Sequence, residues 1–262
     1  VLFLVNCRPL IPTFFYTFVL MRKLITLIFL LLSSILLFSQ NYDEMPAIHA
    51  ESWVSTDLEI KLNKKITFNL KEEIRLKSIG IPYDRIFTQL NFEYTLFRSI
   101  DLGIGYRYIN LNDEEGKLHE IENHQRIHGS LAYTLKLDRF SSKIRGQYQT
   151  RWEHLPNTNI FVSDYRKYWR IKNDFQYNIR NWKFDPKVGV EFFLLNEKQR
   201  GQFNKYRYSI GTNYKLKGPH EISIKYMYEK EVKKWNPVVV HIFDIQYRYI
   251  LRFKKRKLKD DS

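Results

Sequence analysis

Apolar and polar residues alternate along most of the chain after residue 50. In the stretch DLGIGYRYINLN, residues 101–112, Leu102, Ile104 and Tyr106 fall on one face of an extended chain, and Arg107 falls on the other. Alternation with a period of two is typical of β-strands whose two faces meet different surroundings. The pattern predicts an all-β fold and leaves open which face of each strand meets water.

The alternating unit recurs along the chain, and each copy ends at a break in the pattern. Pro186 lies inside one unit and is expected to bulge that strand or delay its start. The predicted strands are residues 51–62, 66–78, 85–97, 100–111, 123–137, 140–153, 165–179, 182–194, 204–216, 220–231 and 238–253.

Short and long breaks alternate between these strands. The short breaks are residues 63–65, 98–99, 138–139, 180–181 and 217–219. The longer breaks are residues 79–84, 112–122, 154–164, 195–203 and 232–237. Such sorting is typical of outer-membrane barrels, which have short periplasmic turns and longer extracellular loops.

Strand length and aromatic placement favour an apolar face turned toward lipid. Runs of about 10 to 15 residues are longer than the soluble average of about five or six, and they suit a tilted membrane crossing. Tyr and Trp side chains prefer the headgroup level, and they gather near both ends of the apolar faces. The predicted aromatic girdle consists of Tyr106, Tyr108, Trp152, Trp169, Tyr206 and Tyr228 near the long loops, and of Trp182, Tyr214 and Tyr247 near the short turns.

Charged residues of both signs occupy the opposite face of the strands. They predict a single antiparallel up-and-down transmembrane β-barrel with a charged lumen. A soluble lipocalin-like barrel or sandwich, with its apolar face inward, is the alternative. The predicted lumen charge network consists of Arg75, Glu93, Arg107, Arg126, Arg145, Arg170, Asp174, Glu191, Arg207 and Arg248.

The number of strands does not fit the usual parity of such barrels. Eleven alternating units are visible, whereas bacterial single-chain barrels have an even number of strands. We therefore expect about 12 strands, with residues 41–51 supplying an irregular extra one. A barrel of ten strands, with that segment in the lumen, is the alternative.

The N-terminal region has the pattern of an export signal. Met21 is followed by two basic residues and a long apolar run, so residues 21–39 predict a signal peptide. A retained membrane anchor is the alternative. Residues 1–20 precede this signal and are interpreted as an over-extended reading frame, residues 40–253 as the barrel, and residues 254–262 as a basic periplasmic tail.

The formal net charge of +15 raises the question of an anionic partner. Export argues against nucleic acid, which is the usual partner of a basic domain. The expected partners are outer-membrane lipid, lipopolysaccharide and the barrel-assembly machinery, and the expected location is the bacterial outer membrane. Cys7 is the only cysteine and precedes the predicted mature chain, so the fold must depend on its sheet and packing rather than on disulfides.

Two motifs carry a family resemblance. The D-x-G-x-G-Y-R-Y run at residues 101–108 and the K-Y-R-x-x-x-G-x-x-Y run at residues 205–214 resemble the Bacteroidota outer-membrane β-barrel family grouped as domain of unknown function 2490. The resemblance extends over nearly all of residues 51–253. It implies a single outer-membrane β-barrel of unknown activity, and it supplies no catalytic residue.

A histidine cluster is the first candidate for chemistry. His124 and His128 share the polar face of one predicted strand, and His119 lies in the preceding break. Strand rise places the β-carbons of His124 and His128 roughly 13 Å apart. One metal ion would then need ligands from neighbouring strands, so we predict lumenal polar residues here, with no metal and no cofactor.

The charged face predicts a non-enzymatic structural barrel whose lumen is filled by salt-bridged side chains. A narrow, weakly anion-preferring pore is the first alternative, because basic residues outnumber acidic ones. A barrel lipid hydrolase that uses Ser141, Ser142 and His154 is the second, but no Gly-x-Ser-x-Gly motif supports it.

Overall fold

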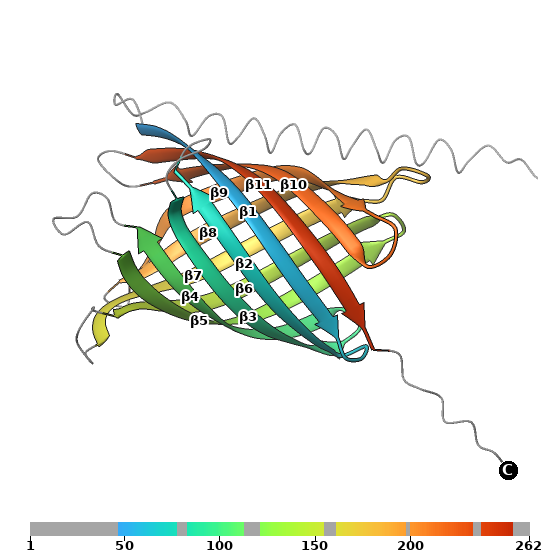
Figure 1. Cartoon of the computed structure of the whole chain (residues 1–262), viewed down its shortest axis with the longest axis horizontal. Helices are drawn as coiled ribbons and strands as arrows, with labels where there is room; N and C mark the ends of the chain where they lie inside the picture. The colour runs from blue at the N-terminus through green and yellow to red at the C-terminus, as the bar shows by residue number, and fades with distance from the viewer. Residues whose placement is uncertain are drawn as a thin grey trace, which may run out of the picture. The chain divides into compact units, whose positions relative to one another are not determined.

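The computed structural model describes residues 47–77, 83–112, 121–154, 161–197, 200–232 and 237–253, which form eleven β-strands (Figure 1). The predicted reading-frame extension, signal peptide and basic tail lie outside these residues. Among the described residues, no helix has the length and apolar character needed to cross a membrane. The strands are β1 Ala47–Lys61, β2 Ile66–Leu76, β3 Tyr83–Phe97, β4 Ile100–Asn112, β5 Ile121–Leu137, β6 Phe140–His154, β7 Phe161–Tyr177, β8 Phe184–Glu197, β9 Arg200–Lys215, β10 His220–Glu231 and β11 Val238–Arg252.

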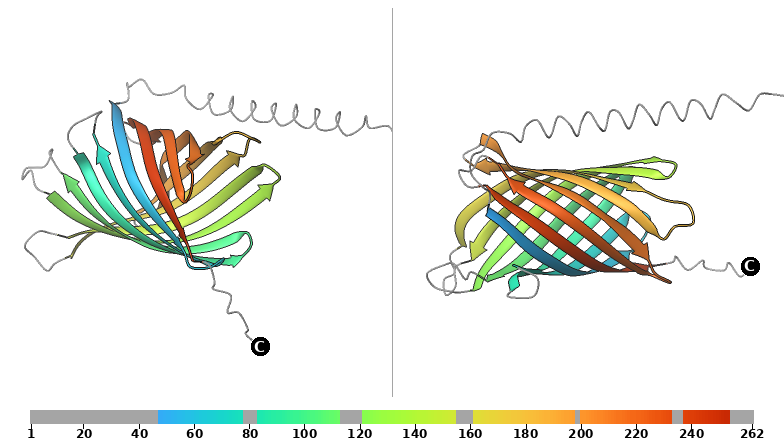
Figure 2. Two further views of the ribbon diagram at one scale, coloured as in Figure 1. Left: turned by 45° about the vertical axis from the view of Figure 1, so that its right-hand side comes forward. Right: turned by 90° about the horizontal axis from the view of Figure 1, so that it is seen from above.

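The strands close into one barrel, in which each strand pairs with its neighbours in sequence and β1 pairs with β11 (Figures 1 and 2). The sequential pairs are antiparallel, whereas β1 and β11 are parallel, from Ala47 opposite Val238 to Lys61 opposite Arg252. The predictions of about 12 strands and of antiparallel pairing throughout are therefore wrong. With an odd number of alternating strands, the first and last run in the same direction and can only pair in parallel.

The expected extra strand is instead the beginning of β1. Residues 47–51 already pair with β11, starting at Ala47, so they lengthen the first strand rather than form a separate one. Residues 41–46 lie outside the described part of the chain.

The pairing register sets the tilt of the strands. Following the paired residues once around the barrel returns to β1 with a displacement of about 14 residues, which corresponds to a strand tilt of about 41°. At that tilt each residue advances about 2.5 Å along the barrel axis, so about ten residues would cross an apolar band of about 25 Å. The strands range from 11 residues in β2 to 17 in β5 and β7 and are long enough for such a crossing.

Side chains sort by polarity between the two faces of the barrel wall. Ile104 on β4 is 58% exposed and Ile210 on β9 is 60% exposed, whereas Glu191 on β8 and Asp244 on β11 are only 4% exposed. This distribution is the reverse of the one in a soluble protein, where apolar side chains are buried and charges are exposed.

Two of the predicted breaks differ from the structure. The long break predicted at residues 195–203 is wrong, because β8 extends to Glu197 and β9 begins at Arg200. The short break predicted at residues 180–181 is longer, since β7 ends at Tyr177 and β8 begins at Phe184. Asn181 has a φ of 61° in this connection, a left-handed conformation that asparagine tolerates better than most residues.

Pro186 lies inside β8 and opposite Thr212 of β9. The pairing of β8 with β7 begins only at the next residue, Lys187. A proline has no backbone N–H to donate, so its position at the edge of the β7–β8 ladder costs that ladder no hydrogen bond.

Candidate functional site

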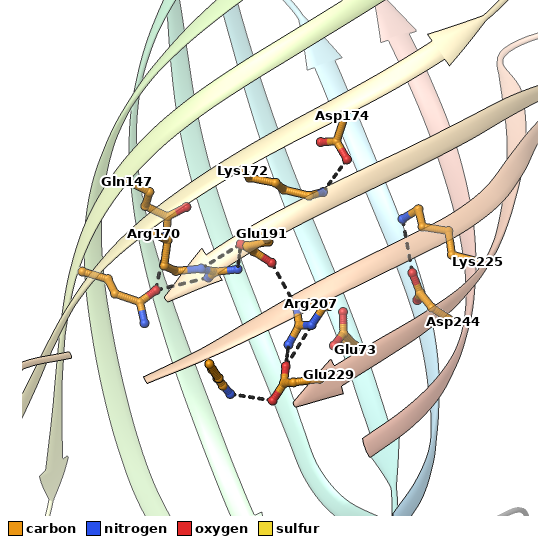
Figure 3. Close-up of polar contacts among 12 residues, drawn as sticks. Glu73, Gln147, Arg170, Lys172, Asp174, Glu191, Arg207, Lys225, Glu229 and Asp244 are labelled. Carbon is orange, nitrogen blue, oxygen red and sulfur yellow. Dashed lines mark hydrogen bonds and ion pairs between the residues drawn. The ribbon is translucent and has the colours of Figure 1, made fainter. Parts of the chain in front are cut away.

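The barrel interior holds a chain of ion pairs that is centred on Arg207 of β9 (Figure 3). Glu191 of β8 and Glu229 of β10 lie directly opposite Arg207 in the register. Arg207 Nη1 lies 3.2 Å from Glu191 Oε2, and Arg207 Nε donates to Glu229 Oε2 at 2.9 Å. Lys205 Nζ donates to the other oxygen of Glu229 at 2.6 Å. We call Glu191, Arg207 and Glu229 the ion-paired row.

The network continues from the ion-paired row toward β6. Arg170 of β7 donates to Glu191 Oε1 from Nη2 at 2.5 Å and from Nε at 3.0 Å. Its Nη1 donates to Gln149 of β6 at 3.2 Å. On the same strand as Arg170, Lys172 Nζ lies 2.9 Å from Asp174 Oδ1 (Figure 3). Glu191 is thus shared by two arginines from the strands on either side of it.

A second group of ion pairs joins the two strands of the parallel closure. Arg248 Nε of β11 donates to Asp57 Oδ2 of β1 at 2.9 Å, and Gln246 Nε2 donates to the same oxygen at 3.0 Å. Arg248 Nη1 also lies 3.6 Å from Glu221 of β10. Lys225 of β10 pairs with Asp244 of β11 at 3.2 Å (Figure 3).

Aromatic rings fill part of the interior between the charges. The guanidinium of Arg75 on β2 lies 3.5 Å from the centroid of the Trp53 ring on β1, and the guanidinium of Arg207 lies 5.1 Å from the same ring. β2 and β9 are not neighbours in the barrel. Trp53 therefore links the ion-paired row to a distant strand, through contacts that favour a cation over an aromatic face.

The opposite wall, formed by β4, β5 and β6, carries a different set of inward residues. Arg107 of β4 lies opposite Arg126 of β5, and Arg126 lies opposite Arg151 of β6. We call these three residues the arginine row. Arg107 donates from Nε to Gln89 at 2.5 Å, and its guanidinium lies 3.6 Å from the Phe87 ring centroid.

The predicted lumen residues therefore fall into two groups, those that make ion pairs and those that do not. Arg75, Arg170, Asp174, Glu191, Arg207 and Arg248 each make an ion pair, with Arg75 Nε 2.7 Å from Glu73 Oε1. Within the described part of the chain, no ion pair involves Glu93, Arg107, Arg126 or Arg145.

Sequence reasoning left several interior partners out of the predicted network. Asp57 and Glu229 carry the acidic side of two clusters, and Trp53 and Phe193 stack against arginines. The alternation in each strand places all four on the polar face, and that signal could have found them.

The predicted girdle residues lie on the outer face or at its edges. Tyr106, Tyr108, Trp169, Trp182 and Tyr247 are exposed, and Trp152, Tyr206, Tyr214 and Tyr228 are half-buried. Several of them touch other rings, as where the Tyr206 centroid lies 5.3 Å from that of Tyr208 and the Phe184 centroid lies 4.9 Å from that of Tyr214.

One group of side chains has the composition of a metal site. Glu122, His124 and Glu153 offer ligand atoms that all lie within 4.8 Å of one another, and His124 Nε2 is 2.9 Å from Glu122 Oε2. One imidazole and two carboxylates could hold a divalent transition metal. The sequence singled out His124, but it gave no sign that β6 would bring Glu153 beside it.

A small interior cavity of about 40 Å³ lies near the parallel closure. That volume is sufficient for a few water molecules and far below the 300–1,000 Å³ of a typical ligand pocket. It is lined by Lys187, Asn213, Glu221, Ser223, Lys225, Gln246 and Arg248.

Comparison with known proteins places the chain in a family. The model of the family described as "Protein of unknown function (DUF2490)" matches residues 50–236, which extend from β1 to the segment before β11. A search of curated proteins gives no match. The matched residues contain both motifs and the ion-paired row, and the chain belongs to the DUF2490 family of proteins of unknown function.

Proposed function

We propose that the protein is a non-enzymatic β-barrel of the bacterial outer membrane, with a lumen closed by charged side chains. The observation that carries this proposal is the reversed distribution of polarity, with exposed side chains such as Ile104 and Ile210 outside and buried ones such as Glu191 and Asp244 inside. In water such a surface would expose large apolar patches, whereas in a bilayer the same side chains meet acyl chains.

Closure of the barrel supports the same proposal. A bilayer offers no hydrogen-bond partner to a free strand edge, so only closed barrels and helices can cross it. The parallel pairing of β1 with β11 leaves no free edge in the described sheet. The expected surroundings are outer-membrane lipid and lipopolysaccharide, with insertion by the barrel-assembly machinery.

The interior contacts favour a closed lumen over an open channel. Arg207 contacts Glu191 and Glu229, and it also approaches Trp53 on the far side of two intervening strands. Barrels of eight strands are filled by their side chains, and barrels of 16 to 18 leave an aqueous channel. An eleven-stranded barrel is closer in size to the eight-stranded barrels, and its long, paired side chains can fill much of its interior.

A narrow anion-preferring pore is the second candidate function. The arginine row favours it, because three like charges on one wall would attract anions entering from either end. This candidate shares the membrane location of the first and differs only in whether the lumen conducts.

Membrane fractionation and planar-bilayer conductance test these proposals together. The native protein should sediment with outer membranes and migrate faster on gels unheated than after boiling, as folded barrels do. Recovery as a soluble periplasmic protein would overturn the location. We expect the refolded protein to give no stable single-channel steps, and regular steps with anion selectivity would replace the closed barrel by the pore.

Enzymatic activity is tested on the same material. We expect no release of fatty acid from phospholipid or lipopolysaccharide by the refolded barrel. A release that a Ser142→Ala variant abolishes would instead establish a hydrolase.

A further inference from the structure

The arginine row places like charges where strand pairs usually place opposite ones. Arg126 lies directly opposite Arg107 on one side and Arg151 on the other. Residues that face each other in this way have β-carbons about 4.5–5.5 Å apart, and like charges there are destabilising. The charges of Arg170 and Arg75 act on Arg126 as well, and Glu73 offsets part of this repulsion. The row therefore concentrates positive charge on one part of the inner wall.

No carboxylate of the described residues lies within ion-pair distance of Arg107 or Arg126. Among the described residues, Arg107 contacts the amide of Gln89 and the face of Phe87, both of which are neutral. The Nε of Arg126 is buried and has no hydrogen-bond partner. Two residues along β5, the Nδ1 of His128 is also buried without a partner. A buried N–H such as that of Arg126 normally finds an acceptor, so Arg126 has unused hydrogen-bonding capacity.

We propose that the arginine row is a binding site for a phosphate-class oxyanion in the barrel interior, with Arg107 and Arg126 as its principal contacts. A guanidinium presents a planar fork of N–H donors that matches the oxygens of phosphate, and a doubly charged anion would offset the repulsion between facing arginines. This inference needs only the closed barrel and does not depend on whether the lumen conducts.

The location of the row indicates a soluble phosphate rather than a lipid headgroup. Arg107 and Arg126 face the interior, whereas the neighbouring Tyr106 and Ile127 are exposed on the outer face. A free phosphate or a small phosphorylated solute would meet this row only inside the barrel. The phosphate of a membrane lipid would meet the outer face instead.

Inorganic phosphate is the probe for this site. The full-length exported protein, refolded in detergent, would be titrated with phosphate and with chloride at equal ionic strength, by calorimetry and by unfolding temperature. We expect phosphate to bind and to raise the unfolding temperature above the chloride value. Equal unfolding temperatures in the two salts, with no heat of phosphate binding, would overturn the proposal.

Arg126→Gln tests whether the row is the site. Hydrogen bonds to charged groups contribute enough that losing this arginine should weaken phosphate binding about tenfold or more. Arg145→Gln is the matched control, because Arg145 lies on the inner face of β6 opposite Ala132 and six residues, about 20 Å, from Arg151. A similar loss in both variants would show that phosphate responds only to total charge and would overturn the assignment.

Two further arms complete the test. Where Arg126→Gln does not refold, as judged by heat-modifiable migration, Arg107→Gln takes its place, and an undiminished phosphate response in that variant overturns the proposal. Anionic phosphatidylglycerol vesicles form the second arm. If these vesicles raise the unfolding temperature and inorganic phosphate does not, the phosphate contact lies on the outer face and the interior site is rejected.

Discussion

Two rows of inward side chains lie on opposite parts of the same barrel. Each row places three residues opposite one another on three neighbouring strands, but the charges in the two rows differ. The ion-paired row sets Glu191, Arg207 and Glu229 opposite one another across β8, β9 and β10. The arginine row has the same register across β4, β5 and β6, but all three of its residues are basic. The backbone arrangement is common to both, so the difference lies wholly in side-chain charge.

The charges of the ion-paired row hold the barrel together, whereas those of Arg107 and Arg126 are, on our proposal, available to a ligand. In the ion-paired row each carboxylate already accepts hydrogen bonds from Arg207 or its neighbours. Removing one partner from such a buried group leaves the others uncompensated, which is costly. In the arginine row the removal of one charge relieves repulsion. Removal of a charge should therefore lower the stability of the barrel in the ion-paired row. In the arginine row it should leave stability equal or raise it, and should weaken anion binding.

The largest expected effect is that of Arg207→Ala. Glu191 and Glu229 would lose a shared partner in the barrel interior, and the free energy of unfolding should fall by about 3–5 kcal/mol. Urea unfolding of the refolded barrel, followed by tryptophan fluorescence, measures the change. A loss below about 1 kcal/mol would mean that the ion-paired row does not stabilise the barrel and would remove the contrast between the two walls.

Ile104→Arg tests the outer face of the wall that carries the arginine row. Ile104 is 58% exposed there, and an arginine in the proposed lipid-facing band should cost about 2–4 kcal/mol. Gly105→Ser is its inward counterpart, where a Cβ would clash with Asn91 Oδ1 and His128 Cε1. Those atoms are ends of side chains that can shift, so we expect the smaller loss from Gly105→Ser. Equal refolding yields of the two variants in lipid vesicles would contradict the proposed orientation.

Two glycines extend the comparison to the backbone. A Cβ at Gly211 of β9 would clash with the carbonyl oxygen of Ile224 and lie 2.9 Å from the Cα of Lys225, whereas a Cβ at Gly129 of β5 would meet nothing within 4 Å. Gly211→Ala should lower the free energy of unfolding by about 1–3 kcal/mol, and Gly129→Ala should change it by less than about 0.5 kcal/mol. Urea midpoints of the two variants give the difference, and matching midpoints would argue against the close β9–β10 approach.

The smallest effect is expected from Arg126→Gln in phosphate-free buffer. Loss of one charge from the arginine row removes like-charge repulsion, so the unfolding free energy should stay equal or rise by less than about 1 kcal/mol. The same urea experiment measures it. A loss as large as that of Arg207→Ala would show that Arg126 has a stabilising partner after all and that the two walls are alike.

Strand positions were predictable because alternation is a local signal. The predicted strand at residues 100–111 differs from β4, Ile100–Asn112, by one residue, and the predicted strand at residues 123–137 ends with β5 at Leu137. The break predicted at residues 195–203 failed because Asn196, Glu197 and Lys198 are all polar, and this run hides the alternation that β8 and β9 carry on each side.

Which residues of neighbouring strands face each other was harder to predict from the sequence than where each strand begins and ends. Alternation shows that Arg126 and Arg207 face the same side of the wall, but the contrast in their partners depends on the register of neighbouring strands. Register depends on contacts between separate strands, and the alternation within one strand does not determine it. The parallel closure was missed for a different reason. Eleven alternating units were visible, but the even strand number usual in bacterial barrels led to the prediction of a twelfth strand.

The parallel closure between β1 and β11 has a consequence for the order in which the barrel forms. Sequential strands meet through short connections, but the hydrogen bond from Arg248 to Asp57 joins residues 191 positions apart. Closing so long a segment costs more chain entropy than closing a hairpin, and contacts of high sequence separation slow folding. The sheet should therefore grow from its hairpins, with the β1–β11 contact completed last. Until that step both outer strands expose unpaired backbone groups, which makes this contact the point at which an unfinished barrel is most open to pairing with another chain.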